Sequence, residues 1–154
     1  MADNTVKDTQ SRKWQITINN PVEKGMGHAY IAEKVGEMKN VIYWCMADEI
    51  GENGTYHTHI YMHGRNGIRF STLKKRFDGG HFEMAKGTSS QNRDYVKKEG
   101  RWLNDKKHET CVDGTFEEFG ECPIERQGAR NDISDLYAMI KDGMSNYDIL
   151  EQNP

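Results

Sequence analysis

NVIYWCMADE (residues 40–49), IGENGT (50–55) and YHTHIYMHG (56–64) form the continuous stretch that decides the fold. The first segment is rich in β-branched and aromatic residues, which favour a β-strand, and the third has the composition of another strand. The middle segment is short and rich in glycine, which favours a turn between two antiparallel strands. The stretch therefore predicts a β-hairpin.

Two elements are predicted before the hairpin. KWQITIN (13–19) alternates apolar with polar residues, which indicates a half-buried strand. HAYIAEKVGEMK (28–39) repeats apolar residues near helical spacing, at Ile31, Val35 and Met38, and this pattern predicts a helix.

Three elements are predicted after the hairpin: a short helix over FSTLKKRF (70–77), a strand over GGHFEMAKG (79–87) and a helix over TSSQNRDYVKKEG (88–100). In the last of these, Thr88 or Ser89 is expected to cap the N-terminus and Gly100 to lie just past the end. KHETCVDGTFEEFGECP (107–123) has a turn signal between short apolar alternations and predicts a hairpin or an edge strand.

The predicted order, β-α-β-β-α-β-α, is typical of an α+β fold with a central antiparallel sheet of about five strands flanked by helices. We expect a flexible N-terminus over residues 1–12 and one domain over residues 13–120. A linker and the start of a helical segment are expected over residues 121–154, because the apolar residues of DISDLYAMIKDG (132–143) form one helical stripe. The sequence has no apolar run of the ~20 residues that span a membrane and no secretory signal, so an intracellular protein is expected.

Charge is distributed unevenly along the chain. The formal net charge is −3, but residues 64–103 carry 10 basic and 4 acidic side chains, whereas residues 104–154 carry 5 and 12. A local basic region attracts phosphates whatever the total charge, so the centre of the chain is a candidate for nucleic-acid binding. The alternative is that the basic run over residues 69–77 is a solvated helix face.

His57 and His59 are candidate metal ligands, because residues two apart on a strand share a face and both imidazoles can reach one ion. In a hairpin, Glu49 lies against His57 and adds a carboxylate, whereas Asp48 points to the opposite face. Two imidazoles and one carboxylate leave coordination positions open and suit Mn²⁺ or Mg²⁺. His63 shares this face but lies too far along the strand to join the same ion, so we expect it at the surface or facing DNA. The alternative is a strand that carries histidines without a metal.

Tyr95 is a candidate nucleophile. In the predicted helix over residues 88–100, Gln91, Tyr95 and Lys98 share one face, because residues three and four apart are neighbours. A tyrosine can attack a phosphodiester and form a covalent intermediate, while a lysine stabilises charge or positions water. The alternative is that Tyr95 packs between helix and sheet and that Lys98 is a solvated charge.

Three motifs, in this order, resemble those of a known family. WQITINNP (14–21), the HTH of residues 57–59 and DYVKKEG (94–100) are similar to the motifs of circovirus-type replication initiators, the Rep proteins of small circular single-stranded DNA viruses and related plasmids. HFEMAKGTSSQNRDY (81–95) is also close to the family pattern. One residue departs from it, since Thr58 stands where the family has a bulky hydrophobic residue between the two histidines.

The resemblance implies an HUH endonuclease domain with an RRM-like sheet. Tyr95 would nick single-stranded origin DNA, leaving a 5′-phosphotyrosine link and a free 3′-OH, and the reverse transfer would rejoin the strand. Glu49, His57 and His59 would hold Mn²⁺ or Mg²⁺, and Lys98 would assist catalysis. DNA contacts are expected from the following residues: Asn19, Asn20, Arg65, Arg69, Lys74, Lys75, Arg76, Lys86 and Gln91.

The resemblance also implies partners and a location. The substrate would be single-stranded DNA at a stem-loop origin, and the host replication polymerase would extend the free 3′-OH. The full-length protein is expected to form a homo-oligomer, and the helical segment within residues 121–154 would be the start of its oligomerisation segment. Its location would be the host nucleus if the source is a virus and the bacterial cytoplasm if it is a plasmid. The chain contains no Walker A sequence, so ATPase activity is not expected from it. The alternatives are a non-catalytic RRM-like module that binds single-stranded nucleic acid and a metal-dependent hydrolase without a covalent intermediate.

Overall fold

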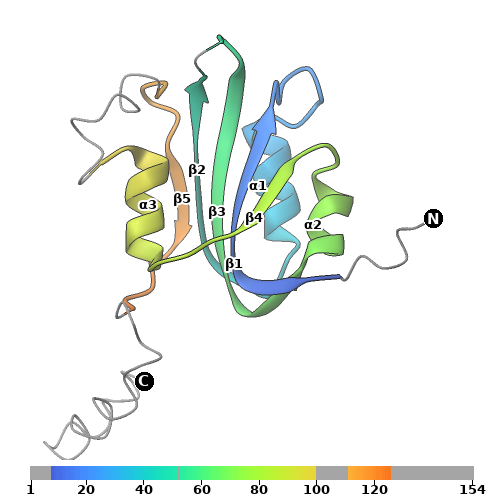
Figure 1. The fold of residues 1–154 in the computed structure, drawn as a ribbon, viewed down its shortest axis with the longest axis vertical. Helices are drawn as coiled ribbons and strands as arrows, with labels where there is room; N and C mark the ends of the chain where they lie inside the picture. The colour runs from blue at the N-terminus through green and yellow to red at the C-terminus, as the bar shows by residue number, and fades with distance from the viewer. Residues whose placement is uncertain (1–7, 52, 100–110, 126–154) are drawn as a thin grey trace, which may run out of the picture. The chain divides into compact units, whose positions relative to one another are not determined.

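The computed structural model describes residues 8–51, 53–99 and 111–125. In these ranges the chain forms, in order, β1 (Gln10–Asn19), α1 (His28–Gly36), β2 (Val41–Ile50), β3 (Tyr56–Arg69), α2 (Phe70–Arg76), β4 (His81–Met84), α3 (Ser89–Lys97) and β5 (Glu117–Gly120) (Figure 1). This order confirms the predicted succession of elements and adds β5 after α3. α1 ends earlier than predicted, although Met38 beyond it still packs into the core.

The strands of the described ranges form one five-stranded sheet with the order β4-β1-β3-β2-β5, in which all neighbours are antiparallel. β2 and β3 form the predicted hairpin, with Met46 opposite Ile60. β1 pairs with the other side of β3, and β4 pairs with β1 at one edge. β5 pairs with β2 at the other edge, so the segment over residues 107–123 provides an edge strand. The predicted α+β fold class is confirmed.

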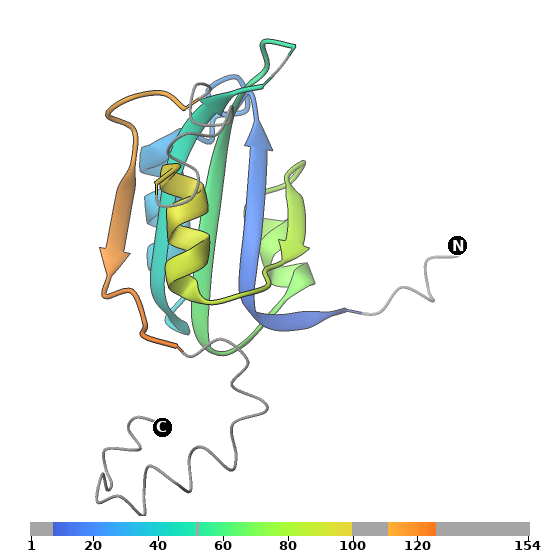
Figure 2. The same cartoon turned by 60° about the vertical axis from the view of Figure 1, so that its left-hand side comes forward.

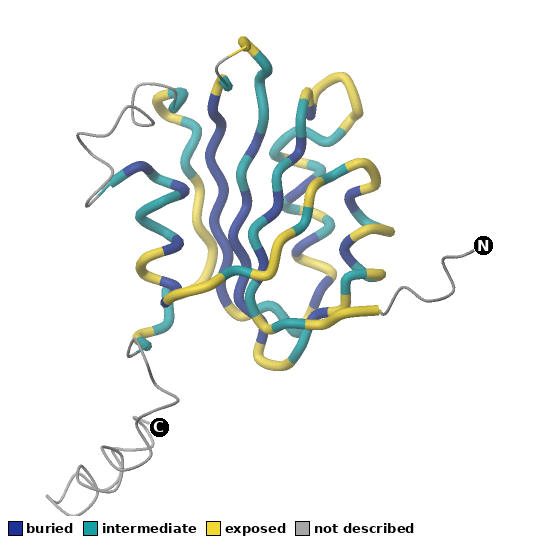
Figure 3. Tube along the Cα trace, viewed as in Figure 1, coloured by how far each residue is buried: buried dark blue, intermediate teal, exposed yellow. Residues whose placement is uncertain are grey.

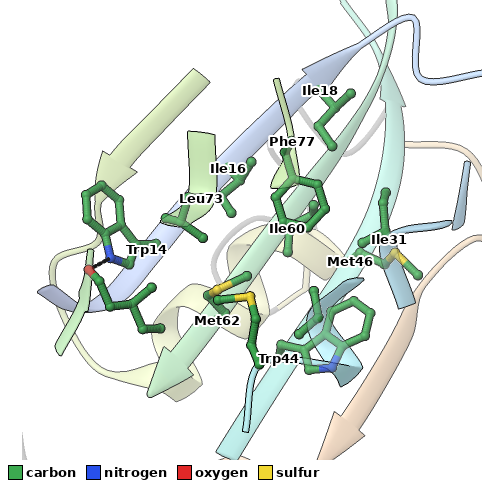
Figure 4. Close-up of a cluster of buried hydrophobic side chains, with 13 residues drawn as sticks. Trp14, Ile16, Ile18, Ile31, Trp44, Met46, Ile60, Met62, Leu73 and Phe77 are labelled. Carbon is green, nitrogen blue, oxygen red and sulfur yellow. Dashed lines mark hydrogen bonds between the residues drawn. The ribbon is translucent and has the colours of Figure 1, made fainter. Parts of the chain in front are cut away.

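Helices cover both faces of the sheet (Figure 1 and Figure 2). α1 and α2 pack on one face, and α3 packs on the other over β2 and β3. Successive residues of a strand point to opposite faces, so the alternation of each strand divides its side chains between two cores. The larger core contains the following buried residues (Figure 4): Trp14, Ile16, Ile18, Ile31, Val35, Met38, Trp44, Met46, Ile60, Met62, Ile68, Leu73 and Phe77. The smaller core, under α3, contains Tyr43, Cys45, Ala47, Tyr61 and Val96.

The described helices leave part of the α3 face of the sheet uncovered. In Figure 2, α3 lies over β2 and β3, and β1 and β4 run beside it without a helix above them. β4 exposes three of its four side chains (Figure 3). The side chains of β1 that point to this face are partly exposed and polar: Lys13, Gln15, Thr17 and Asn19. We call these four residues, together with β4, the open strip.

The chain divides into two units, Met1–Pro123 and Ile124–Pro154. The sheet and the helices described above belong to the first unit. The predicted linker and the predicted helix over residues 132–143 lie outside the described residues, so the domain boundaries at residues 12 and 120 stay predictions. None of the described helices is both long and apolar enough to span a membrane.

Candidate active site

Glu49, His57 and His59 converge on the α3 face of the β2–β3 hairpin. The register pairs Glu49 with His57 and Ala47 with His59. The Cβ atoms of opposed strand residues are about 5 Å apart, so one carboxylate reaches both imidazoles. Oε1 of Glu49 is 3.7 Å from Nε2 of His57, and Oε2 is 3.4 Å from Nδ1 of His59. The hairpin thus brings the three predicted ligands together.

The donor set of these side chains fits a divalent metal. One ligand atom from each residue lies within 4.8 Å of the others, and no second cluster of this kind occurs in the part of the chain that the structure describes. Only 9% of the Glu49 side chain and 13% of each histidine side chain are exposed. Two imidazole nitrogens and a carboxylate oxygen, at bond lengths of about 2.0–2.2 Å, leave further coordination positions for a substrate.

Glu49 is ionised at neutral pH. Burial disfavours the charged carboxylate, but the contacts with His57, His59 and Lys98 outweigh burial and lower the pKa of Glu49 to about 2. The shortest of these contacts joins Oε2 of Glu49 to Nζ of Lys98, at 2.6 Å. Because a carboxylate must lose its proton to bind a metal, Glu49 is already in the binding form.

Lys98 reaches this carboxylate from just beyond the end of α3. Its backbone has φ 61° and ψ 46°, the left-handed conformation that glycine usually adopts after a helix. Its side chain is fully buried, and Nζ also donates to the carbonyl oxygen of Tyr95 at 2.8 Å. The prediction that Gly100 lies just past the helix is therefore wrong, because α3 ends at Lys97 and Lys98 takes the glycine-like position. Left-handed backbone costs a non-glycine residue about 1–2 kcal/mol and is typical of functional sites.

Tyr95 faces the histidines from α3. Its ring centroid is 5.7 Å from that of His59, and Nζ of Lys98 is 3.8 Å from the Tyr95 ring centroid. The Tyr95 side chain is half-buried. The structure therefore places the predicted nucleophile, the predicted lysine and the predicted ligands side by side.

The N-terminal end of α3 is fixed by a capping box. Oγ1 of Thr88 accepts from the N–H of Gln91 at 3.1 Å, and Oε1 of Gln91 accepts from the N–H of Thr88 at 2.9 Å. Thr88 is thus the cap, and Gln91, a predicted DNA contact, already serves the helix. The Asn92 amide donates to the carbonyl oxygens of Lys86 and Thr88, while its Oδ1 accepts from Gln15 at 2.8 Å. These bonds tie α3, and with it Tyr95, to β1.

A polar network lies directly behind the candidate metal site, on the other face of the hairpin. Asp48 points away from Glu49, as predicted, and accepts from Oγ1 of Thr58 at 2.8 Å, the hydroxyl of Tyr56 at 2.5 Å and Nε2 of His28 at 2.7 Å. Burial opposes the ionised form, but these bonds outweigh it and lower the pKa of Asp48. The same bond to Asp48, together with the contact of Nδ1 with Glu117 at 2.7 Å, outweighs burial and raises the pKa of His28 to about 9.

Thr58 therefore has a partner that the sequence analysis missed. It replaces the hydrophobic residue that the family pattern has between the two histidines, and its hydroxyl is fully buried against Asp48. The signal was present in the hairpin register, which places Asp48 directly opposite Thr58. A threonine and an aspartate that face each other inside a protein are expected to form a hydrogen bond.

His63 is buried, contrary to the prediction of a surface or DNA-facing histidine. It does share the face of His57 and His59, but only 4% of it is exposed, because the start of α3 covers it. Nδ1 of His63 is 2.7 Å from Oγ of Ser89, and the hydroxyl of Tyr61 is 2.6 Å from the same oxygen. The strand pattern gave the face of His63 correctly but not the position of the covering helix.

The predicted DNA contacts do not form one surface. Asn19 lies opposite His57 in the β1–β3 pair, and Asn20 follows it with a positive φ of 49°. Lys86 precedes α3 in the loop from β4. Five others lie elsewhere, with two in the last part of β3 and three on α2 across the sheet from α3: Arg65, Arg69, Lys74, Lys75 and Arg76. The basic centre of the sequence is thus divided between the two faces of the sheet.

The open strip contributes polar residues that the sequence analysis did not select as candidate contacts. Lys13, Gln15 and Thr17 point to the same face as Asn19, and Thr17 lies opposite His59. The alternation of β1 already placed Gln15 and Thr17 on the polar face, but nothing in the sequence showed that no described helix covers them.

Comparison with known families assigns the chain. The model of the family described as "Putative viral replication protein" matches residues 11–99, which include every residue of the candidate site. The chain belongs to this family. The resemblance found in its motifs is therefore confirmed.

Curated relatives of the chain include proteins named as replication-associated proteins of viruses. The protein of beak and feather disease virus is 38% identical over 89 residues, which are 58% of this chain and 29% of the relative. That of pigeon circovirus is 27% identical over 145 residues, 89% of this chain and 37% of the relative. Para-Rep C2 of a subterranean clover stunt alphasatellite is 41% identical over 58 residues, 37% of this chain and 21% of the relative. This chain spans less than half the length of each.

Proposed function

We propose that this chain contains the endonuclease domain of a rolling-circle replication initiator, which nicks single-stranded origin DNA and rejoins it. The observation that carries the proposal is that Tyr95 and Lys98 meet the cluster of Glu49, His57 and His59 on one face of the sheet. A strand that only displays histidines would not require a buried lysine in a strained conformation beside them. Membership of the viral replication protein family supports the same conclusion.

In the proposed reaction, the phenol oxygen of Tyr95 attacks the scissile phosphorus. The bond from phosphorus to the 3′ oxygen breaks as the bond to Tyr95 forms, so the phosphate stays on the protein as a 5′-phosphotyrosine. The phenol gives up its proton, and the leaving 3′ oxygen takes one up to become a free 3′-OH. Attack of a 3′-OH on the phosphotyrosine reverses the step and rejoins a strand, so no high-energy cofactor is consumed.

The residues around Tyr95 have separate roles in this proposal. Glu49, His57 and His59 would hold Mn²⁺ or Mg²⁺, which, when bound, polarises the phosphate oxygens and orients the scissile bond. Lys98 keeps Glu49 ionised and in place. Its ammonium also lies beside the Tyr95 ring, where it stabilises negative charge that develops on the phenol oxygen.

Single-stranded DNA would cross the open strip. Lys13 offers a cation, and Gln15, Thr17 and Asn19 offer hydrogen bonds, which are the groups that hold phosphates and base edges. Because Thr17 and Asn19 lie opposite His59 and His57, the strip leads directly to the candidate metal site. The proposed strand path is therefore continuous with the proposed site of cleavage.

The wider role follows from the relatives and is part of the proposal, because this chain spans less than half of their length. We expect the full-length protein to act as a homo-oligomer at a stem-loop origin in the host nucleus. The host polymerase would extend the 3′-OH released by Tyr95.

A covalent-adduct assay tests the proposed function. The chain is incubated with Mn²⁺ and a pool of labelled hairpin oligonucleotides that have a randomised loop, and the products are separated on a denaturing gel. We expect a labelled protein band and a shortened oligonucleotide, and sequencing of the trapped DNA gives the preferred loop. Tyr95→Phe should abolish both products, because phenylalanine has no oxygen to attack phosphorus.

Tyr43→Phe is the matched control, since Tyr43 is buried in the smaller core on the same face but lies far along β2 from Glu49. It should retain both products. Cleavage that survives Tyr95→Phe would indicate a metal-dependent hydrolase without a covalent intermediate. Binding of the pool without any cleavage would favour the non-catalytic binding module.

A further inference from the structure

The cations of α2 do not lie where the nicked strand would run. Lys74, Lys75 and Arg76 belong to a helix that packs through Leu73 into the core shared with α1. α3, which carries Tyr95, packs on the opposite face (Figure 1 and Figure 2). With packed layers spaced by about 10 Å, the axes of α2 and α3 are roughly 20 Å apart. The α2 cations therefore lie too far from Tyr95 to contact the phosphates next to it.

A groove of about 440 Å³ lies between α1 and α2, and we call it the α1–α2 groove. It is lined by Tyr30, Lys34, Ser71, Thr72, Lys75 and Arg76. The lining thus has three cations and three hydroxyls, and no acidic side chain of the described residues contributes to it. Because the Ser71 hydroxyl donates to Oδ2 of Asp8 at 2.8 Å and the Tyr30 hydroxyl to the carbonyl oxygen of Arg76, phosphate contacts would come mainly from Thr72 and the lysines. Arginine, lysine, serine and threonine are among the side chains that contact phosphate oxygens in protein–DNA complexes. The groove has the chemistry of a phosphate-binding surface.

Contacts within the protein fix the shape of this groove. The hydroxyl of Tyr30 donates to the carbonyl oxygen of Arg76 at 2.6 Å, which ties α1 to α2, and the guanidinium of Arg76 donates to Glu37 at 2.7 Å. The Tyr30 ring packs edge-on against the Phe77 ring, with centroids 6.3 Å apart. Nζ of Lys34 lies 5.4 Å from the centroid of the Tyr30 ring. The aromatic ring is therefore engaged within the protein. Bases of a single strand usually stack on an aromatic face, and the groove offers mainly contacts to phosphates.

Lys74 and Lys75 supply uncompensated charge. Both are exposed on α2. Within the ranges 8–51, 53–99 and 111–125, neither has a carboxylate at ion-pair distance, whereas Arg76 has Glu37. Such lysines can neutralise DNA phosphates and release the counterions condensed on them.

We propose that the α1–α2 groove binds the phosphate backbone of double-stranded DNA that flanks the nicked strand. The inference rests on the proposed function, because it gives the duplex next to the cleavage site its own surface. A duplex carries one charge per about 1.7 Å of its axis and keeps the faces of its bases stacked inside. Those properties match a groove lined by cations whose aromatic ring is already engaged. The nicked strand then lies on the α3 face and its flanking duplex on the α1–α2 face.

Binding of two probes by the full chain tests this proposal. One probe is a hairpin with a mixed-sequence stem, and the other is the same loop as a single strand without the stem. Fluorescence anisotropy at several salt concentrations gives the affinity and its salt dependence for each probe. The first variant, Lys75→Glu, reverses one lysine of the groove. The second, Lys34→Glu/Lys75→Glu, reverses one lysine on each side of the groove.

Lys97→Glu is the matched control, because it also reverses one lysine in the last turn of a short helix, but on α3. Wild-type protein should bind the hairpin more tightly than the loop. Lys75→Glu should weaken hairpin binding roughly fivefold and reduce the slope of log K against log salt by about 1, since each lost phosphate contact removes about 0.9 from that slope. The double variant should reduce the slope by about 2, and neither variant should change binding of the loop. Lys97→Glu should leave the difference between hairpin and loop unchanged.

Three results would overturn the proposal. Equal weakening for hairpin and loop would show that the groove holds a single strand. Unchanged hairpin binding in the double variant, with circular dichroism showing a folded protein, would assign the groove to a partner other than DNA. A wild-type protein with no preference for the hairpin would also contradict it. Nicking of the loop by Tyr95 is measured in parallel. A negative result for duplex binding by the groove is then distinguishable from a negative result for the proposed endonuclease function.

Discussion

Replacing Lys98 with methionine tests the buried ion pair at the candidate active site. Methionine keeps most of the side-chain volume but removes the ammonium 2.6 Å from Oε2 of Glu49. Lys98 is fully buried and 9% of the Glu49 side chain is exposed, so the carboxylate is left charged in a poorly solvated place. Breaking a buried pair by removing one partner costs 3–5 kcal/mol, and the remaining histidines favour the lower end, about 3 kcal/mol. That is a large part of the 5–15 kcal/mol by which a typical domain is stable.

The loss of stability in Lys98→Met should depend on pH. Because the folded-state pKa of Glu49 is lowered to about 2, its ion pairs stabilise the protein fully above its ordinary pKa near 4.5, and this stabilisation disappears as the pH falls through 2. The variant should therefore differ most from wild type at pH 7 and less at pH 4. Urea unfolding in EDTA, followed by tryptophan fluorescence at both pH values, measures this. Added Mn²⁺ should stabilise the variant more than wild type, because a metal replaces the missing positive charge.

A control and a mutant cycle complete the test. Lys97→Met removes the neighbouring lysine, whose partner Glu99 is 46% exposed, and should change stability by less than about 0.5 kcal/mol. In the cycle of Glu49→Gln with Lys98→Met, the double variant should be more stable than the sum of the single effects by about 2 kcal/mol or more. A loss below about 1 kcal/mol at pH 7, or an equal loss at both pH values, would refute the assignment of a buried charged pair.

Three further predictions concern the residues around the site. Thr58→Val removes the hydroxyl bonded to Asp48 and should lower the unfolding free energy by about 1–2 kcal/mol in urea unfolding. His28 should titrate with a midpoint near 9 in NMR, and a midpoint near 6.5 would contradict this. The stabilisation from its bond to Asp48 should be fully present below pH 6.5 and should disappear as the pH rises through 9. His63→Leu removes one of the two partners of the buried Ser89 hydroxyl, which keeps that of Tyr61, and should cost about 1 kcal/mol in urea unfolding, whereas an exposed histidine would tolerate the change.

Much of the fold was predictable because the strands alternate. The run over residues 13–19 has one polar and one apolar face, whereas the strand over residues 41–50 is buried on both faces along most of its length. Each pattern is consistent with only one strand register. That register was enough to pair Glu49 with His57 and to send Asp48 to the other face. Thr88 was predictable as a helix cap because its hydroxyl can accept from the first turn.

What the sequence could not give depends on how layers pack. The burial of His63 follows from the position of α3, which the strand pattern does not contain. Lys98 was read as part of a helical face, because no rule predicts a lysine in a left-handed conformation unless its buried partner is known. The cations over residues 65–76 are predicted as DNA contacts together with Lys86, since linear order does not show that α2 and α3 lie on opposite faces of the sheet.

The central claim is that Tyr95 attacks phosphorus beside the cluster of Glu49, His57 and His59. Mass spectrometry of the protein–DNA adduct, after digestion with protease and nuclease, tests it most directly. We expect a single modified peptide with a nucleotide phosphate on Tyr95, formed only when a divalent metal is present and absent in His57→Ala. A phosphate on any other residue, or an adduct that forms equally well in EDTA, would contradict it.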